Sequence, residues 1–176
     1  MKKAIIFIIL LATLGLSTVF AQDNKCVQEA WVINKKIGKD FSVRDNPKPS
    51  GKIIGNIPFV TEDDVETTVE IIGYSNGWLK IQKAHSIDEK VIFEGIGWIP
   101  AKRVTAVVQR PDGNSKKSAT LYSQPKSSSK KVGTIPSDEL IDIIGFDCFG
   151  LKVSYKGKKG WLSRNNICGN PVTTCS

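Results

Sequence analysis

Residues Val43 to Pro58 read Val-Arg-Asp-Asn-Pro-Lys-Pro-Ser-Gly-Lys-Ile-Ile-Gly-Asn-Ile-Pro, and a related stretch returns later in the chain. Residues Leu121 to Pro136 read Leu-Tyr-Ser-Gln-Pro-Lys-Ser-Ser-Ser-Lys-Lys-Val-Gly-Thr-Ile-Pro, which aligns without a gap at a constant offset of 78 positions. Internal repetition of this kind defines the unit of folding. The sequence therefore predicts one small β module that is used twice.

The repeat continues beyond this stretch with a falling offset. Residues 70–74 match residues 142–146 at an offset of 72, and residues 97–99 match residues 160–162 at an offset of 63. The fall places two insertions in the first copy, roughly at residues 59–69 and 83–95. Insertions between matched β segments normally belong to surface loops, so we expect loops there.

Short β-prone segments separated by turn residues run through both copies. Residues 75–77 are Ser-Asn-Gly and predict a tight turn. In the strand that follows, alternation places Leu79 and Ile81 toward the core and Trp78 on the opposite side. No window sustains a helical period, so we expect almost no α-helix. The prediction is an all-β fold of two small tandem β-barrels.

The N-terminus has the pattern of an export signal. Lys2 and Lys3 precede an apolar run from Ala4 to Phe20, and small residues follow near Ala21. We expect residues 1–21 to be a cleaved signal peptide, which leaves no membrane span; the alternative is an uncleaved anchor. The expected location is periplasmic, or extracellular and associated with the cell wall.

Charge is distributed unevenly along the chain. The whole sequence carries +8, and removal of residues 1–21 takes away two lysines and no acid, so the mature charge is +8 − 2 = +6. Residues 22–110 contain 13 basic and 12 acidic residues, whereas residues 111–176 contain 10 and 5. A basic half favours an anionic partner, and export favours the cell envelope over nucleic acid. The alternative is a lysine-rich solvated face.

The four cysteines, Cys26, Cys148, Cys168 and Cys175, all follow the predicted cleavage site. An even number in an exported chain predicts two disulfides, for which three pairings exist. Cys168 and Cys175 are close enough to close a loop in the tail, which would leave Cys26 to reach Cys148. We favour that pairing; the other connectivities and four free thiols remain alternatives.

The repeat divides the mature chain into two modules and a tail. Residues 106–108 stand before the second copy roughly as residues 31–33 stand before the first. We therefore predict module one at residues 22–105, module two at residues 106–168, and a C-terminal tail at residues 169–176.

At this point the motifs resemble a known family, the bacterial SH3-like (SH3b) domains of exported proteins. In module one the resemblance lies in Ser42-Val43-Arg44, Gly55-Asn56-Ile57, residues 77–81 (Gly-Trp-Leu-Lys-Ile) and Gly97-Trp98-Ile99. In module two it lies in Gly133-Thr134-Ile135 and in residues 155–162 (Tyr-Lys-Gly-Lys-Lys-Gly-Trp-Leu).

The resemblance implies partly open SH3-like β-barrels and a role in holding cell-wall peptides or targeting proteins to the envelope. Module two departs from the pattern, because Gly150 stands at the position of Trp78 and Tyr122 at that of Arg44. The groove tyrosine of eukaryotic SH3 domains, expected three residues after Pro100, is Arg103 here. Recognition of proline-rich peptides, which needs an aromatic groove, is therefore disfavoured.

Exposed aromatic residues are the best candidates for ligand binding, because amphipathic rings dominate many binding sites. Trp78 and Tyr74 flank the predicted turn and could form a platform; alternatively, Trp78 caps the barrel end or packs on the other module. The predicted ligand-binding residues are Tyr74, Trp78, Trp98, Arg44, Tyr122, Phe146 and Trp161.

The inventory of reactive side chains is small. His85 is the only histidine and falls in a predicted insertion loop, and the cysteines are expected in disulfides. The acidic run at residues 62–66 lacks the glycine-punctuated spacing of a calcium loop. We therefore predict a non-catalytic protein without cofactor or metal. The expected function is binding of peptidoglycan peptides or an envelope protein, and the alternative is a structural or protein–protein adaptor that does not touch the wall.

Overall fold

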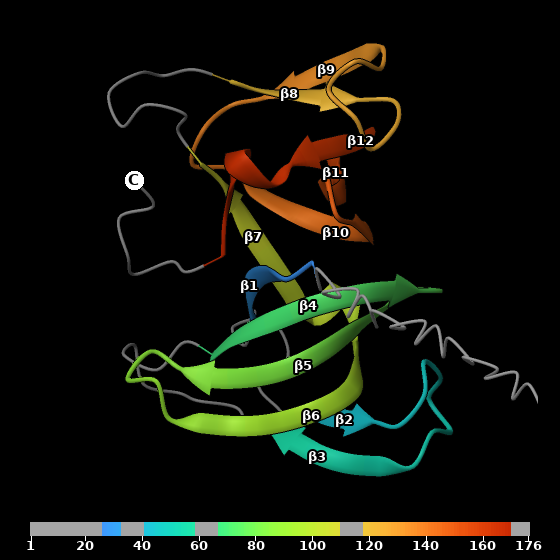
Figure 1. The fold of residues 1–176 in the computed structure, drawn as a ribbon, viewed down its shortest axis with the longest axis vertical. Coiled ribbons are helices and arrows are strands. Elements are labelled where there is room, and N and C mark those ends of the chain that lie inside the picture. Colours follow the sequence, from blue (N-terminus) through green and yellow to red (C-terminus); the bar gives the residue numbers. More distant parts are fainter. Residues whose placement is uncertain (1–25, 33–40, 59–66, 110–117, 170–176) are drawn as a thin grey trace, which may run out of the picture.

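The computed structural model describes residues 26–32, 41–58, 67–109 and 118–169. This part of the chain is all-β, as predicted, and its helices are two 3-10 turns, η1 and η2. The elements are β1 (Gln28–Val32), β2 (Phe41–Arg44), β3 (Ile53–Ile57), β4 (Thr67–Ser75), β5 (Trp78–Ser86), β6 (Val91–Pro100), η1 (Ala101–Arg103), β7 (Val104–Val108), β8 (Ala119–Tyr122), β9 (Lys131–Ile135), β10 (Leu140–Asp147), β11 (Gly150–Tyr155), β12 (Lys158–Ser163), η2 (Arg164–Asn166) and β13 (Ile167–Cys168). Strands β1–β6 gather in one half of the molecule and β8–β12 in the other (Figure 1).

The sequence repeat is also a structural repeat. Strands β2 and β3 pair in the same register as β8 and β9, so Val43 opposite Gly55 corresponds to Leu121 opposite Gly133. Each pair has its irregularity at the equivalent position, just before Arg44 and just before Tyr122. Val43 and Leu121 are both fully buried. The apolar residue at this position therefore points into the core in both copies.

The insertion at residues 83–95 does not form the predicted loop. It lengthens β5 and β6 to 9 and 10 residues, whereas β11 and β12 have 6 each. Lys83 and Ala84 pair with Glu94 and Phe93 across the extended hairpin. Pairing gives the added backbone amides and carbonyls hydrogen-bond partners, which explains why the insertion is accommodated as strand. The first insertion lies largely outside the described residues, and its last three residues belong to β4.

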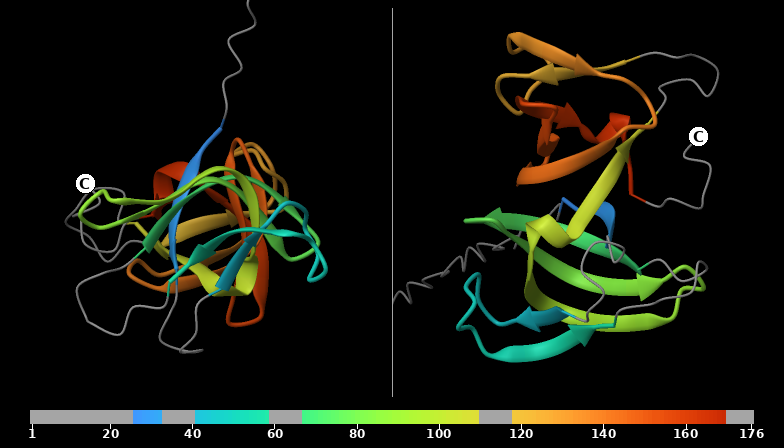
Figure 2. Two further views of the ribbon diagram at one scale, coloured as in Figure 1. Left: turned by 90° about the horizontal axis from the view of Figure 1, so that it is seen from below. Right: turned by 180° about the vertical axis from the view of Figure 1, so that it is seen from behind.

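Strand β7 belongs to both halves. At its start, Val104 and Thr105 pair with β1, and from Thr105 to Val107 it pairs with β10. Figure 2 shows β7 running from one half of the molecule into the other. One antiparallel sheet path therefore continues from β3 to β9, and the predicted module boundary at 105/106 falls inside a strand.

The buried side chains form one contiguous cluster that extends from Ala30 to Ile167. Strand β10 also packs on β4 and on η1, across the two halves. Two independent barrels would each enclose a core of their own, so the prediction of separate tandem barrels is not confirmed. We keep the names module one and module two for the two copies of the repeat.

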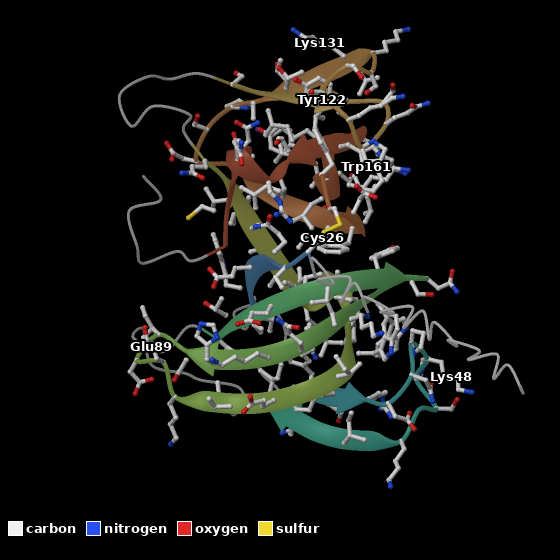
Figure 3. The ribbon with its side chains drawn as sticks, in the orientation of Figure 1. Cys26, Lys48, Glu89, Tyr122, Lys131 and Trp161 are labelled. Atoms are coloured by element: carbon white, nitrogen blue, oxygen red, sulfur yellow. A yellow bond between two sulfur atoms is a disulfide. The ribbon has the colours of Figure 1, made fainter. Side chains whose placement is uncertain are left out.

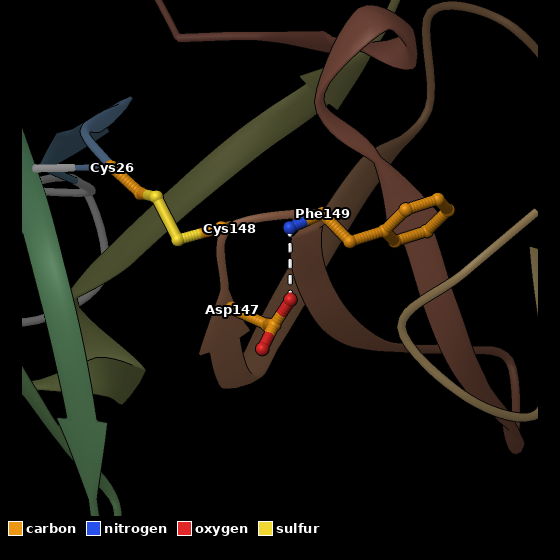
Figure 4. The surroundings of a disulfide bond; sticks show 4 residues. All are labelled: Cys26, Asp147, Cys148 and Phe149. Atoms are coloured by element: carbon orange, nitrogen blue, oxygen red, sulfur yellow. Dashed lines mark hydrogen bonds between the residues drawn. A yellow bond between two sulfur atoms is a disulfide. The ribbon is translucent and has the colours of Figure 1, made fainter. Parts of the chain in front are cut away.

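A disulfide joins Cys26 to Cys148, the predicted pairing. Cys26 lies just before β1, and Cys148 lies at the turn between β10 and β11, so the bond connects the beginning of module one to module two (Figures 3 and 4). Cys168 is not a free thiol. Its predicted partner, Cys175, lies outside the described residues, and so do the predicted signal peptide and nearly all of the C-terminal tail. No helix among the described residues is long and apolar enough to cross a membrane.

Candidate functional site

A hollow of about 840 Å³ opens where the two modules meet. We call it the junction hollow. Four segments line it: β2 with the loop after it, the β4–β5 turn, η1 with the residue before it, and the middle of β10. Its lining residues are Phe41, Ser42, Arg44, Pro49, Tyr74, Gly77, Trp78, Pro100, Ala101, Lys102, Arg103, Asp142, Ile143 and Ile144.

Tyr74 and Trp78 lie on either side of the β4–β5 turn, as the sequence predicts. Asn76 and Gly77 both have positive φ, 47° and 82°, which is the backbone of a tight hairpin turn that suits Asn-Gly. The Gly77 carbonyl accepts a hydrogen bond from the Ala101 amide at 2.8 Å, which ties the turn to η1. Leu79 is fully buried while Trp78 is half-buried, so the indole lies on the hollow side of the strand.

Three basic side chains line the hollow beside these rings: Arg44, Lys102 and Arg103. The Arg44 Nη1 donates to the Gly51 carbonyl at 2.6 Å, so this guanidinium holds the loop between β2 and β3. The Arg103 guanidinium lies over the Phe41 ring, with Cζ 5.3 Å from the ring centroid. Asp142 is the only acidic residue in the lining. The hollow thus combines an apolar wall with a net positive charge.

The remaining predicted site residues do not line the hollow. Trp98 pairs with Arg44 across β6 and β2, and its ring lies 6.0 Å from the Lys80 ammonium. In module two, Trp161 pairs with Tyr122 in the equivalent position; Figure 3 shows both in the half opposite to β1–β6. Phe146, the equivalent of Tyr74, packs against the core.

In the described part of module two, the position equivalent to Trp78 carries no ring. Gly150 replaces Trp78 and adopts a φ of 153°, where a Cβ would lie 2.1 Å from the Leu162 carbonyl oxygen. Tyr122 instead contacts Phe149 edge to face, with ring centroids 5.8 Å apart. At the tip of this turn, Cys148 takes part in the disulfide, and the Asp147 carboxylate accepts a hydrogen bond from the Phe149 amide (Figure 4).

Of the residues that line the hollow, the sequence predicts only Arg44, Tyr74 and Trp78 as binding residues. Arg103 was noted only as a substitution for a groove tyrosine, yet it lines the same hollow as Trp78 and Pro100. Its spacing from Pro100 was the available signal. Asp142 and the two residues after it come from the other module, and no local pattern places them beside the β4–β5 turn.

His85 and the acidic run at residues 62–66 are the two other sequence features that were considered for catalysis or metal binding. The prediction that His85 lies in a loop is wrong. His85 lies in β5, where its backbone pairs opposite Thr68 and Val91. Its Nδ1 is buried and has no hydrogen-bond partner among the described residues. The acidic run at residues 62–66 lies outside the described residues.

Several solved structures are similar to this chain. The structures of NlpC2 and NlpC1 from Trichomonas vaginalis share 15% and 17% identity with it, each at a TM-score of 0.33. The alignments cover 82% and 84% of this chain and 48% and 47% of those chains. An NlpC/P60 family protein from Bacillus cereus ATCC 10987 shares 13% identity at a TM-score of 0.27, over 80% of this chain and 56% of that one. This chain therefore spans about half the length of the structures it matches.

The prediction of a non-catalytic protein is corrected by these neighbours. Two of them are named NlpC2 and NlpC1 and the third is an NlpC/P60 family protein, so the absence of catalysis is not retained for this chain.

Comparison with curated proteins finds no match. A family model does match one part of the chain: residues 117–167 fit the model described as bacterial SH3 domain. The match covers most of module two, and a single copy is found. Residues 117–167 therefore contain the bacterial SH3 domain that the sequence resemblance predicted.

Proposed function

We propose that this chain is an exported protein that binds a peptide of the bacterial cell wall, or a protein of the envelope, in the junction hollow. The observation that carries the proposal is the meeting of Tyr74, Trp78 and Pro100 with basic side chains in one hollow. Its volume, about 840 Å³, lies in the range of small-molecule and peptide sites.

The disulfide supports the exported location. Disulfides form and persist in oxidising compartments and are rare in the cytosol. Cys26 and Cys148 are 122 positions apart and are brought together only by the fold. We therefore regard this bond as a structural disulfide. A location outside the cytoplasm would bring the protein to the wall, and the bacterial SH3 domain at residues 117–167 agrees with a role there.

Co-sedimentation with purified peptidoglycan tests the proposal. Trp78→Ala removes the largest ring of the hollow and should reduce the bound fraction at least tenfold, since aromatic anchors dominate binding sites. Trp98→Ala removes a ring of the same size from the neighbouring strand β6, outside the hollow, and should leave most binding intact. Absence of wild-type binding at low salt contradicts binding of a wall peptide. Loss of binding in both variants would place the site elsewhere on module one.

The second candidate is a protein–protein adaptor that does not bind the wall. Strand β3 lies at one end of the sheet path and exposes Ile53 by 56% and Ile54 by 41%. Exposed apolar residues on an edge strand favour pairing with another chain. The adaptor predicts no co-sedimentation of the wild type with peptidoglycan, and loss of partner binding in Ile53→Lys.

A further inference from the structure

The junction hollow carries an uneven set of charges. Arg44, Lys102 and Arg103 contribute three positive charges, and Asp142 contributes one negative charge. The equivalent positions in module two are Tyr122, Asn165 and Asn166. Module two is the more basic copy by composition, yet the cationic lining is a property of module one.

Arg103 is the basic residue placed to bind a ligand. Its guanidinium is held over the Phe41 ring, and Phe41 is itself buried. Its Nη1 is buried and has no hydrogen-bond partner among the described residues. A charged donor without an acceptor is costly, and the partly exposed Arg103 side chain lines the hollow, so an acceptor on a bound ligand can reach the guanidinium there. The guanidinium fork fits a carboxylate, which can accept two parallel hydrogen bonds.

The other two basic residues have different roles. Arg44 already donates to the Gly51 carbonyl, so part of its hydrogen-bonding capacity holds the loop. Lys102 is exposed at the edge of the hollow and adds attraction without fixing an orientation. Asp142 is exposed and forms no ion pair with Arg103 in the described part of the chain. It would therefore repel an anionic ligand.

We propose that the junction hollow recognises its peptide through a carboxylate, which binds the Arg103 guanidinium while apolar parts of the peptide pack on Tyr74 and Trp78. This inference rests on the proposed function, because it specifies the chemical group that the same hollow takes. It makes Arg103 a binding residue and Asp142 a residue that lowers affinity for the same ligand.

The test compares two forms of one probe. Purified peptidoglycan is stripped of phosphate polymers, and half of it is treated with carbodiimide and ammonia, which converts its carboxylates into carboxamides. Binding isotherms are measured on both forms for the full chain and three variants. Arg103→Gln removes the guanidinium, Asp142→Asn removes the opposing charge, and Lys131→Gln is the control. Lys131 is exposed on β9, at the far end of the molecule from module one (Figure 3).

Wild type should bind native wall roughly 10- to 100-fold more tightly than amidated wall, the range expected for a charge-assisted hydrogen bond. Arg103→Gln should bind both forms equally, and Lys131→Gln should keep the full preference. Asp142→Asn should bind native wall about 2- to 5-fold more tightly, as expected for an exposed charge. If Arg103→Gln does not fold, the inference is still tested by the affinity of Asp142→Asn for native wall and by the wild type's preference for native over amidated wall.

The other outcomes overturn the inference in distinguishable ways. Equal wild-type binding to native and amidated wall contradicts recognition of a carboxylate but agrees with the proposed function. No wild-type binding to the wall, either before or after the phosphate polymers are stripped, removes binding of a wall peptide as the proposed function. Binding that disappears when phosphate polymers are stripped identifies a phosphate as the ligand instead. Equal loss of preference in Arg103→Gln and Lys131→Gln indicates general charge attraction, and weaker binding by Asp142→Asn indicates a cationic group.

Discussion

The two modules place a hairpin turn at equivalent positions and use it differently. Residues 75–78 in module one and residues 147–150 in module two are equivalent. In each, the third residue's carbonyl accepts a hydrogen bond from the residue that begins the 3-10 turn: Gly77 from Ala101 at 2.8 Å, and Phe149 from Arg164 at 2.9 Å. This hydrogen bond is therefore common to both copies, although Asn76 and Gly77 have positive φ whereas Cys148 and Phe149 do not.

The side chains at the two tips differ. Module one presents Asn76 and then Trp78, whose ring lines the junction hollow. Module two presents Cys148, which is bonded to Cys26, and then Gly150, whose position has no room for a side chain. One tip is available to a ligand, while the other closes the chain on itself. The comparison shows that a repeated turn need not mean a repeated function.

The disulfide should have the largest effect on stability. The double variant Cys26→Ser, Cys148→Ser releases a loop whose ends are 122 positions apart. In the chain-entropy view a loop of this length is worth roughly 4–5 kcal/mol, and measured values typically fall at about 2–4 kcal/mol. We expect a loss of about 2–5 kcal/mol in the free energy of unfolding, measured by guanidinium denaturation.

Asn76→Ser is the matched control, because residue 76 is the equivalent tip in module one and carries no crosslink. Asn76→Ser should change the free energy of unfolding by much less than the loss of the disulfide does. An unchanged free energy of unfolding in the double cysteine variant would show that the pairing of β7 and the packing of β10 on β4 and η1 hold the two modules together without the disulfide.

Substitution of the two turn glycines gives the next largest difference. At Gly150 a Cβ meets backbone atoms of Leu162, Ser163 and Arg164 at 2.1–3.0 Å, and the φ of 153° disfavours any side chain. Gly77 also has positive φ, but a Cβ there meets nothing within 4 Å. Gly150→Ala should therefore cost about 3 kcal/mol or more, and Gly77→Ala about 1 kcal/mol. Equal costs in thermal unfolding would contradict the difference between the tips.

The loop between β2 and β3 and the loop between β8 and β9 should respond separately to mutation. Arg44 holds the loop of module one through the Gly51 carbonyl. In module two the residue equivalent to Gly51 is Ser129, whose hydroxyl hydrogen-bonds with Gln124 and Lys126. Arg44→Met and Ser129→Ala should each cost about 1 kcal/mol.

Amide hydrogen exchange separates these two effects. Arg44→Met should speed exchange at Asp45 and Gly51, whose amides close the first loop, and leave Ser123 unaffected. Ser129→Ala should do the reverse. Faster exchange in both loops in either variant would mean that the modules share loop stability as well as a core.

The smallest effect is expected at an exposed charged pair in module two. Hydrogen bonding to Tyr155, and then to Lys156, holds the pKa of Glu139 below its ordinary value of 4.5, and the Lys156 ammonium lies 3.3 Å from its carboxylate. A lowered pKa contributes stability above the unfolded value, and this contribution is lost as pH falls through the lowered pKa. Lys156 is 70% exposed, so solvent screens the pair.

Melting temperatures of wild type and Glu139→Gln should therefore differ slightly at pH 7 and converge near pH 3. A difference that persists unchanged at pH 3 would assign the effect to packing instead of charge. Glu139 lies in the stretch between β9 and β10, and the equivalent stretch of module one falls outside the described residues.

Local features of the fold could be predicted from the sequence, whereas contacts between the modules could not. The constant offset of 78 positions predicts that β8 pairs with β9 in the same register as β2 with β3. Strand register depends on the alternation of side chains and on the turns, and the repeat preserves both. Loop length and export favoured the pairing of Cys26 with Cys148. The role of β7 in both halves escaped prediction, since Val104–Val108 reads as one apolar strand whichever neighbours it pairs with.

The same limit applied to the candidate site. Tyr74 and Trp78 were found because they flank a turn with a clear signature. Asp142 enters the hollow only through the packing of β10 on β4 and η1, which is a contact between segments far apart in the chain. Trp98 and Trp161 share one repeat position and were predicted together, but neither lines the hollow.

The central claim, that the module-one side of the junction binds the ligand, can be tested with the four tryptophans of the chain. In a ¹⁵N-labelled sample, the indole N–H groups of Trp31, Trp78, Trp98 and Trp161 give separate NMR signals that point mutants assign. On titration with soluble peptidoglycan fragments, we predict that the Trp78 signal shifts or broadens first and most strongly. A shift of the Trp161 signal with Trp78 unmoved would contradict the account and transfer the site to module two.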